Sequence, residues 1–229
     1  SNVKISPNGK FVGVQQRTEE TIVVKIIDLD NAQLLNVHNF GSKGQITDFF
    51  WATDKRLVFT VARENSRNTE IYNVGQLVAA NIDGKRTKLI AGFGSAPDSR
   101  QGVRNRDRTN PDRPAIIVHR LPKDSNKILV SFFDNAGFNE LAELDINNGK
   151  VSYVTTSPVI YPNWIFNNEG KLMGVSSSTL ENNSEIFLFK PNLPKGSLSS
   201  RECSQNQNCY VPPILEYNTR PGWLFFKDF

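Results

Sequence analysis

Turn-forming residues followed by a short apolar run recur four times along the chain. In each copy, Gly, Asn, Asp, Ser or Glu residues come first, a basic residue follows, and the next residues are mostly hydrophobic or β-branched. The copies are Asn8–Val14, Asp54–Thr60, Ser125–Ser131 and Glu169–Val175. Residues of these types favour strands that are bounded by turns. The pattern therefore predicts four strands that each follow a tight turn.

Further short β-prone segments accompany every copy. A second one follows each copy and ends in a turn: Val23–Leu29, Gln76–Ile82, Glu140–Ile146 and Glu185–Phe189. A third one follows the first three turns: Leu34–Val37, Thr87–Ile90 and Lys150–Val154. Apolar segments also precede the copies, as at Phe49–Trp51 and Trp164–Phe166. Asp-Gly and Asn-Gly between such segments are strong hairpin signals, so each repeat is predicted to be a four-stranded antiparallel unit.

The spacing of the repeats favours one fold class. The basic residue of each copy lies at position 10, 56, 127 or 171, which gives intervals of 46, 71 and 44 residues. A four-stranded unit about every 40 to 50 residues is typical of propeller blades, whereas a β-sandwich lacks this longer period. No segment keeps helical apolar spacing for three turns. We expect an all-β chain that forms a β-propeller, or an open arc, of about four four-stranded antiparallel blades.

The long interval and the C-terminal tail are the less regular parts. The excess of the long interval falls on residues 92–114, which are rich in Gly, Pro, Ser, Asn, Asp and Arg and are predicted to form an inserted loop. Residues 191–229 form a less regular tail that ends in the apolar run Trp223–Phe226. We expect residues 1–229 to be a single propeller domain truncated from a larger protein.

The chain has two cysteines, Cys203 and Cys209, in a polar segment of the tail. A disulfide is the favoured interpretation, and it would indicate a secreted or periplasmic protein. Free thiols remain an alternative, and so does a metal site, although zinc would need two further ligands. No apolar run approaches the length of about 18 residues that a membrane-spanning helix needs.

Charge adds one candidate interaction site. The net charge is +4, which is too small to indicate nucleic acid. The predicted loop carries five arginines among three aspartates: Arg100, Arg104, Arg106, Arg108 and Arg113. They could form a docking loop for an acidic partner or a neighbouring domain, but a solvated loop with partly cancelling charges is the commoner case. Nucleic acid is disfavoured here, because only Phe93 could stack on a base.

No residue set for catalysis, metal binding or cofactor binding stands out. The Gly-x-Ser-x-Gly elbow of α/β-hydrolases is missing, and Gly174–Ser178 fails at its last position. His38 and His119 lie among β-prone residues and are interpreted as strand or loop histidines. Asp30, Asp83 and Asp145 are interpreted as turn formers. We therefore predict no catalytic, metal or cofactor residue in this chain.

Four segments resemble one family in the same order along the chain. They are Ile5–Val12, Ile46–Phe59, Leu77–Gly84 and Leu121–Val130, the last of which follows the arginine-rich segment. This set is similar to the N-terminal propellers of the prolyl oligopeptidase group, in its bacterial exported acylaminoacyl- and dipeptidyl-peptidase-like branch. The resemblance covers roughly residues 3 to 175. The blade opening alone is less specific, because Tol-type periplasmic propellers share it.

The resemblance implies a function that depends on a domain outside this chain. Such propellers cover the active site of an α/β-hydrolase domain and restrict entry to short peptides. We therefore expect a non-catalytic domain that gates and selects peptide substrates, with that hydrolase domain and those peptides as its partners. The alternative is a stand-alone periplasmic propeller that binds a protein. A third possibility is an enzyme whose active site lies in the propeller funnel, but the sequence shows no set of catalytic residues for it. An open ring would also expose strand edges, through which copies could self-associate.

Overall fold

The computed structural model describes residues 2–41, 44–64, 71–92, 113–121, 126–133, 138–178, 184–189 and 223–227. In these residues the chain forms sixteen strands and no helix. Accordingly, the described part contains no helix that is long and apolar enough to cross a membrane. The predicted all-β class is confirmed.

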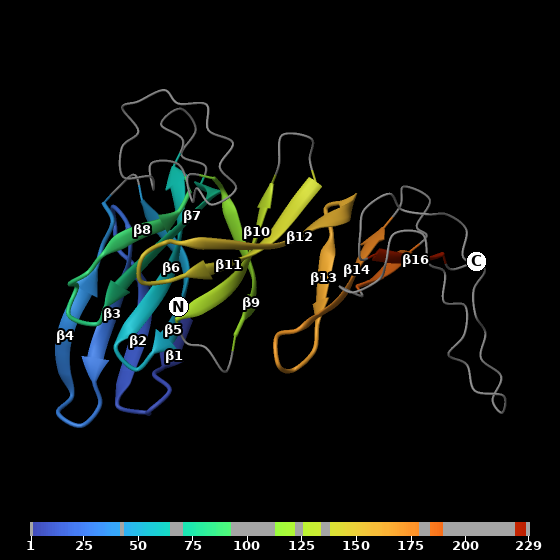
Figure 1. The fold of residues 1–229 in the computed structure, drawn as a ribbon. Coiled ribbons are helices and arrows are strands. Elements are labelled where there is room, and N and C mark those ends of the chain that lie inside the picture. The colour runs from blue at the N-terminus through green and yellow to red at the C-terminus, as the bar shows by residue number, and fades with distance from the viewer. Residues whose placement is uncertain are drawn as a thin grey trace. The chain divides into compact units, whose positions relative to one another are not determined.

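The strands form four sheets of four, and in each sheet neighbours in sequence are neighbours in space (Figure 1). Sheet 1 contains β1 (Asn2–Ile5), β2 (Phe11–Arg17), β3 (Ile22–Asp28) and β4 (Gln33–His38). Sheet 2 contains β5 (Gln45–Thr53), β6 (Arg56–Glu64), β7 (Ile71–Asn81) and β8 (Lys88–Ala91). Sheet 3 contains β9 (Ala115–Arg120), β10 (Lys127–Phe133), β11 (Phe138–Asp145) and β12 (Val151–Ile160). Sheet 4 contains β13 (Asn163–Phe166), β14 (Leu172–Ser178), β15 (Ser184–Phe189) and β16 (Trp223–Lys227).

The chain divides into two compact units. The first comprises Ser1–Phe133 with Leu141–Val154, and the second comprises Asp134–Glu140 with Thr155–Phe229. Sheets 1 and 2 belong to the first unit and sheet 4 to the second, while β11 and β12 contribute residues to both.

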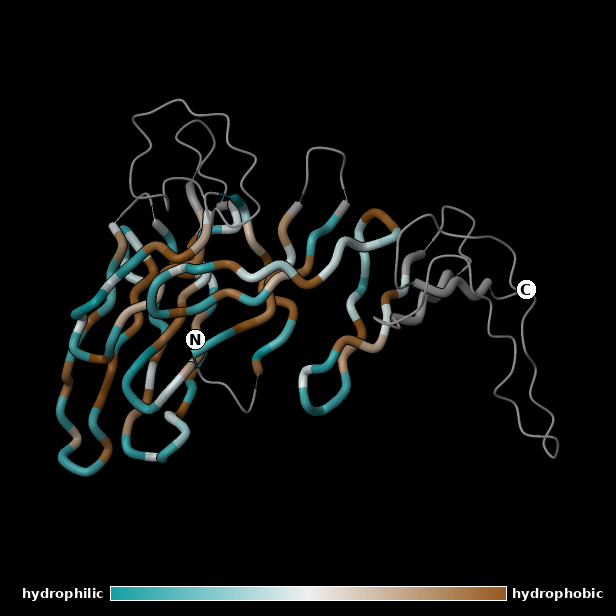
Figure 2. The backbone as a smooth tube through the Cα atoms, in the orientation of Figure 1, coloured by the Kyte–Doolittle hydropathy of each residue, from teal (hydrophilic) through white to brown (hydrophobic). Residues whose placement is uncertain are grey.

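Sheet 2 is the middle layer of the first unit. Successive side chains of a strand point to opposite faces, and in sheet 2 both faces are apolar. Phe49 and Phe59 pack with Val24 of sheet 1 in one core cluster. Their sequence neighbours Phe50 and Val58 pack in a second cluster with residues of sheet 3. Figure 2 shows the hydrophobic stretches along these strands and the hydrophilic hairpin ends.

The predicted turns explain where the strands begin. Gly9, Gly84, Gly149 and Gly170 all have positive φ angles, between 73° and 78°. Glycine adopts this conformation without the steric cost of a Cβ atom. Side chains complete the turns: Asn8 Oδ1 accepts a hydrogen bond from the Lys10 N–H at 3.1 Å. Asp83 and Asp145 likewise accept hydrogen bonds from backbone N–H groups in their turns.

The end of the chain differs from the expectation. From the sequence, the apolar run Trp223–Phe226 was placed in a less regular tail, and no third β-prone segment was recognised directly after the turn of the fourth repeat. The run instead forms most of β16, which pairs antiparallel with β15. This pairing completes the fourth sheet and gives hydrogen-bond partners to the backbone N–H and C=O groups on that edge of β15. The local sequence of β15 did not indicate which segment would supply them.

Candidate binding site along two sheet edges

The candidate site is a cavity of about 630 Å³ in the first unit. It lies between sheets 2 and 3, with Phe50, Leu77 and Ala115 among its apolar lining residues. The complete lining is Thr47, Asp48, Phe50, Thr60, Leu77, Ala115, Ile116, Ile117, Val118, His119 and Arg120. This volume is in the range of pockets that hold small ligands.

The cavity runs along the edge of β9. All six residues of this strand, Ala115–Arg120, line it in succession. Because successive side chains alternate between the two faces of a sheet, a cavity that meets every residue must face the edge of the strand. β9 is the last strand of sheet 3 and pairs only with β10 among the described strands. Its second edge therefore presents backbone N–H and C=O groups to the cavity.

The opposite wall includes the end strand of sheet 2. β5 pairs with β6 and with no other described strand. Both edge strands carry an irregularity at the cavity: the register shifts between Ile46 and Asp48 on β5, and next to Val118 on β9. Such bulges twist an edge and interrupt its regular hydrogen-bonding pattern.

Asp48 is neutralised by a neighbouring strand. Its Oδ1 atom lies 2.6 Å from Lys4 Nζ of β1 and accepts a hydrogen bond from Asn2 Nδ2 at 3.0 Å. Lys4 also donates to the Phe49 carbonyl. Trp51 Nε1 donates to the Lys4 carbonyl at 2.9 Å. These contacts tie β1 to β5 and leave the Asp48 carboxylate charge-paired.

Arg120 is the cation of the site. Its guanidinium carbon lies over the Phe50 ring, 4.2 Å from the ring centroid, and this cation–π contact favours that position of the group. Within the described part of the chain no carboxylate is paired with it. Arg120 and Phe50 also line a second cavity of about 210 Å³, which Lys127 borders as well. Lys127, however, is ion-paired with Glu143 at 3.0 Å.

The arrangement is suited to binding. It offers two strand edges, an apolar floor and one oriented cation. The described residues contain no group of three or more His, Cys, Asp or Glu side chains that could hold a metal ion. The cavity residues do not form a nucleophile, base and orienting acid of the hydrolase type.

No site residue predicted from the sequence is among the described residues that line this cavity. Arg113 lies outside the cavity lining, with its guanidinium 5.0 Å from the centroid of the Phe132 ring. Four further arginines of the predicted docking loop and both cysteines lie outside the described residues: Arg100, Arg104, Arg106, Arg108, Cys203 and Cys209. The docking loop and the disulfide therefore stay predictions.

Both histidines lie in strands, as interpreted from the sequence. His119 of β9 lines the cavity. His38 ends β4, where it is buried and its ring centroid lies 4.8 Å from that of Phe59. Burial lowers the pKa of His38 to about 4, although Asp83 acts in the opposite direction.

Sequence reasoning missed Arg120, Asp48 and Lys4 as site residues. Phe50 was recognised only as part of an apolar segment. No local signal marks Arg120, because its partner Phe50 is 70 positions away and on another sheet. Only the packing of sheet 3 against sheet 2 brings them together.

Consecutive four-stranded antiparallel sheets, stacked through two apolar faces in the first unit, define a protein of the β-propeller blade class. No family model matches the chain. No curated protein matches it either.

Solved structures with a similar fold include three bacterial proteins. TolB from Acinetobacter baumannii is 17% identical, with a TM-score of 0.42, over 82% of this chain and 39% of that one. Porphyromonas gingivalis dipeptidyl peptidase 4 is 12% identical, with a TM-score of 0.46, over 82% of this chain and 30% of that one. The Pseudomonas aeruginosa periplasmic gluconolactonase is 13% identical, with a TM-score of 0.36, over 83% of this chain and 66% of that one. The chain thus spans less than half of the first two, and family membership does not follow from these similarities.

Proposed function

We propose that this chain is the propeller region of a serine peptidase of the prolyl oligopeptidase type, and that it gates peptide access to an α/β-hydrolase domain outside the chain. The observation that carries the proposal is the cavity along β5 and β9, which are end strands of their sheets among the described residues. Strand edges recognise peptide main chains through N–H and C=O groups. The resemblance of the four ordered segments to such propellers supports the same class of ligand.

The mechanism of this gate is steric and electrostatic. A short extended peptide reaches the strand edges, while a folded chain does not fit a cavity of about 630 Å³. Arg120 contributes the fixed positive charge of the site. A periplasmic or secreted location belongs to the same proposal and rests on the expected Cys203–Cys209 disulfide.

A stand-alone propeller that binds a protein partner is the second candidate. It is favoured by exposed apolar side chains on sheet 1, among them Val3, Ile5 and Leu34, which are 55 to 62% exposed. Apolar patches of this kind mark interaction surfaces when they are contiguous.

The gene that encodes this chain distinguishes the two candidates. The peptidase proposal expects a further domain of about 250 residues with a Gly-x-Ser-x-Gly elbow. The full-length protein should then cleave short peptides and spare a folded protein that displays the same scissile sequence. A reading frame with propeller repeats alone would overturn the proposal and favour the stand-alone binding module.

A further inference from the structure

Among the described strands β9 pairs only with β10, and its other edge lies beside the cavity. A strand of six residues spans about 20 Å, and all six residues of β9 face the cavity. Added strands satisfy such edges through main-chain hydrogen bonds, which do not depend on the sequence of the added segment.

The bulge on β9 limits what can be added there. Leu129 and Val130 of β10 pair with His119 and Ile117, so Val118 is skipped by the register. A bulge divides the edge into shorter regular pieces and twists it. It therefore disfavours open-ended pairing with a long strand and leaves room for a short peptide.

One end of this edge carries a cation that is paired with no carboxylate among the described residues. Arg120 is the last residue of β9, and a cation–π contact places its guanidinium over the Phe50 ring. Among the other charged residues of this region, Asp48 is ion-paired with Lys4, and Lys127 is ion-paired with Glu143. A planar guanidinium with free N–H groups binds carboxylates through two parallel hydrogen bonds.

We infer that the cavity binds a short extended peptide by strand addition to β9, and that Arg120 receives a carboxylate of that peptide. The inference deepens the proposed function, on which it rests for the class of ligand. It names the recognised chemistry as a peptide main chain plus one carboxylate, supplied by the C-terminus or by an acidic side chain.

The test measures binding to the isolated chain by fluorescence anisotropy. The probe is an N-terminally fluorescein-labelled hexapeptide of alternating Thr and Val with a free C-terminal carboxylate. Its C-terminal amide is expected to bind at least tenfold more weakly. A version with N-methyl groups on alternate residues, which cannot complete the main-chain hydrogen bonds, is also expected to bind at least tenfold more weakly.

Arg120→Gln removes the charge and keeps a planar polar group. We expect this variant to bind the acid and the amide equally, with the acid weakened about tenfold. The matched control, Arg17→Gln at the exposed end of β2, should bind like the wild type. Thermal unfolding of both variants confirms that the fold is retained.

A third peptide identifies the source of the carboxylate. It keeps the C-terminal amide and carries Glu as its last residue. Affinity restored to that of the free acid assigns the carboxylate to a side chain, and affinity left at the level of the amide assigns it to the C-terminus. Either result supports the inference, provided that Arg120→Gln weakens binding of the free-acid peptide.

Three results overturn the inference: no binding of any peptide at millimolar concentration, equal binding of acid, amide and Glu-amide peptides by the wild type, or no effect of N-methylation. Failure here is distinguishable from failure of the proposed function. Peptide binding by a chain whose gene encodes no hydrolase domain would contradict only the proposed gating function. Length-selective peptide cleavage by a full-length protein whose β9 edge binds no peptide would contradict only the inference of strand addition to β9.

Discussion

At the scale of single residues, Gly13 allows sheets 1 and 2 to approach. A Cβ atom added at this position would lie 2.5 Å from Cε2 of Phe49. Phe49 is only 1% exposed and is enclosed by the core cluster that joins the two sheets. Its ring has little freedom to move aside, because protein interiors are close-packed.

Gly13→Ala should therefore lower the free energy of unfolding by about 1 to 3 kcal/mol through overpacking. Urea unfolding of Gly13→Ala, Phe49→Leu and the double variant measures the coupling. The double variant should lose less stability than the two single variants predict together, since the smaller side chain makes room for the methyl group. Strict additivity would show that the clash is relieved elsewhere.

His38 makes stability depend on pH. Burial holds its pKa at about 4 in the folded chain, against about 6.5 when unfolded. Between these values the unfolded state takes up a proton that the folded state does not. The free energy of unfolding therefore falls as the pH is lowered from about 6.5 to about 4.

Removing this histidine should remove that part of the pH dependence. The wild type should lose about 2 to 3 kcal/mol between pH 7 and 4.5 through His38 alone, and His38→Gln should lack this contribution. Urea unfolding at both pH values, with His119→Gln as the matched control that keeps His38, gives the difference. An identical pH-dependent loss in His38→Gln and the wild type would refute the assignment.

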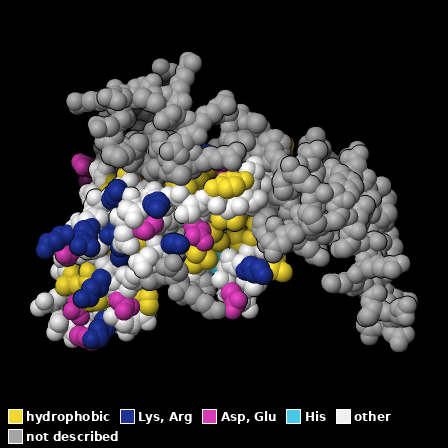
Figure 3. All heavy atoms as spheres, viewed as in Figure 1, with side chains coloured by type: hydrophobic (Ala, Val, Ile, Leu, Met, Phe, Trp, Pro, Cys, Tyr) yellow, Lys and Arg dark blue, Asp and Glu magenta, His cyan; other side chains and the backbone are white. Residues whose placement is uncertain are grey.

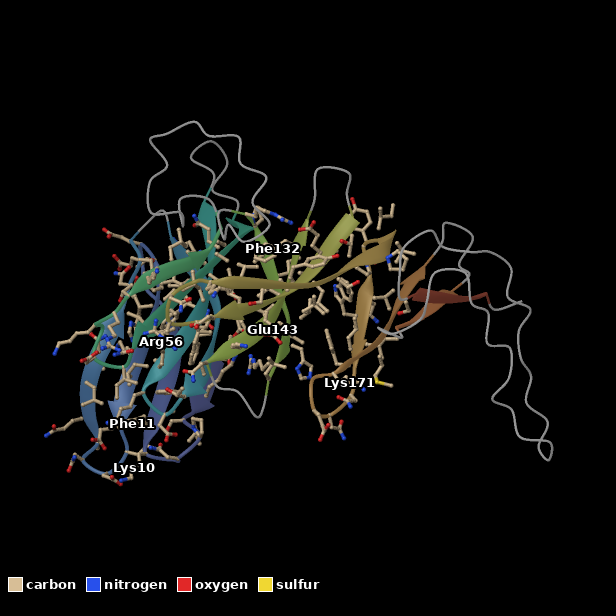
Figure 4. The ribbon with its side chains drawn as sticks, viewed as in Figure 1. Lys10, Phe11, Arg56, Phe132, Glu143 and Lys171 are labelled. Carbon is tan, nitrogen blue, oxygen red and sulfur yellow. The ribbon has the colours of Figure 1, made fainter. Side chains whose placement is uncertain are left out.

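At the scale of elements, the basic residue that marks each repeat has a different environment and different partners in different sheets. Lys10 and Lys171, labelled in Figure 4, are exposed. Lys127 forms an ion pair with Glu143. Arg56 is buried, and its Nη2 atom donates to the Ile146 carbonyl at 2.9 Å while Nη1 donates to Asn81 Oδ1 at 2.8 Å. Burial, followed by the charge of Arg86, lowers the pKa of Arg56. One side chain thus links sheet 2 to the turn after β11.

Arg56→Lys should destabilise the chain by about 2 to 4 kcal/mol, because one ammonium cannot replace this set of bonds and leaves buried acceptors unsatisfied. Lys10→Ala changes the equivalent position of the first repeat and should stay within about 0.5 kcal/mol of the wild type. Chemical unfolding of both variants compares them directly. Equal effects at the two positions would mean that the link between the sheets contributes nothing.

At the scale of the whole molecule, sheet 1 has one face without a partner sheet among the described residues. Phe11 and Gly13 of β2 face sheet 2, so Val12 and Val14 face the other way. Their partners on β1 are Ile5 and Val3, which are 62% and 58% exposed. Figure 3 shows hydrophobic side chains reaching the surface between charged ones in this part of the chain. This face of sheet 1 is apolar, like the two faces of sheet 2 that pack against sheets 1 and 3.

We therefore expect the isolated chain to self-associate at micromolar concentration. Ile5→Lys should shift light scattering toward the monomer, since a charge on this face opposes its burial. Gln33→Lys, which adds the same charge at an exposed polar position of β4, should leave association unchanged. A wild-type chain that is monomeric across this range would contradict the expectation.

Local sequence was sufficient for most of the elements and for their order. Turn residues such as Gly9 and Gly84 require a conformation that few other residues adopt, and alternating apolar positions require a half- or fully buried strand. These preferences act within a few residues, so the repeat, its antiparallel hairpins and the all-β class could be predicted. The strand β16 could not, because its partner β15 precedes it by more than thirty residues of irregular sequence.

The site, by contrast, was decided by tertiary structure. Arg120 and Phe50 meet only because sheet 3 packs on sheet 2, and Lys4 reaches Asp48 only because β1 lies beside β5. The same packing buries Arg56 while Lys10, at the equivalent repeat position, stays in solvent. Local sequence sets backbone conformation and the alternation of faces through short-range sterics, but it does not set which face meets which. That choice depends on side chains far apart in the chain, and it determines where the cavity, the cation and the outer edge of β9 come together.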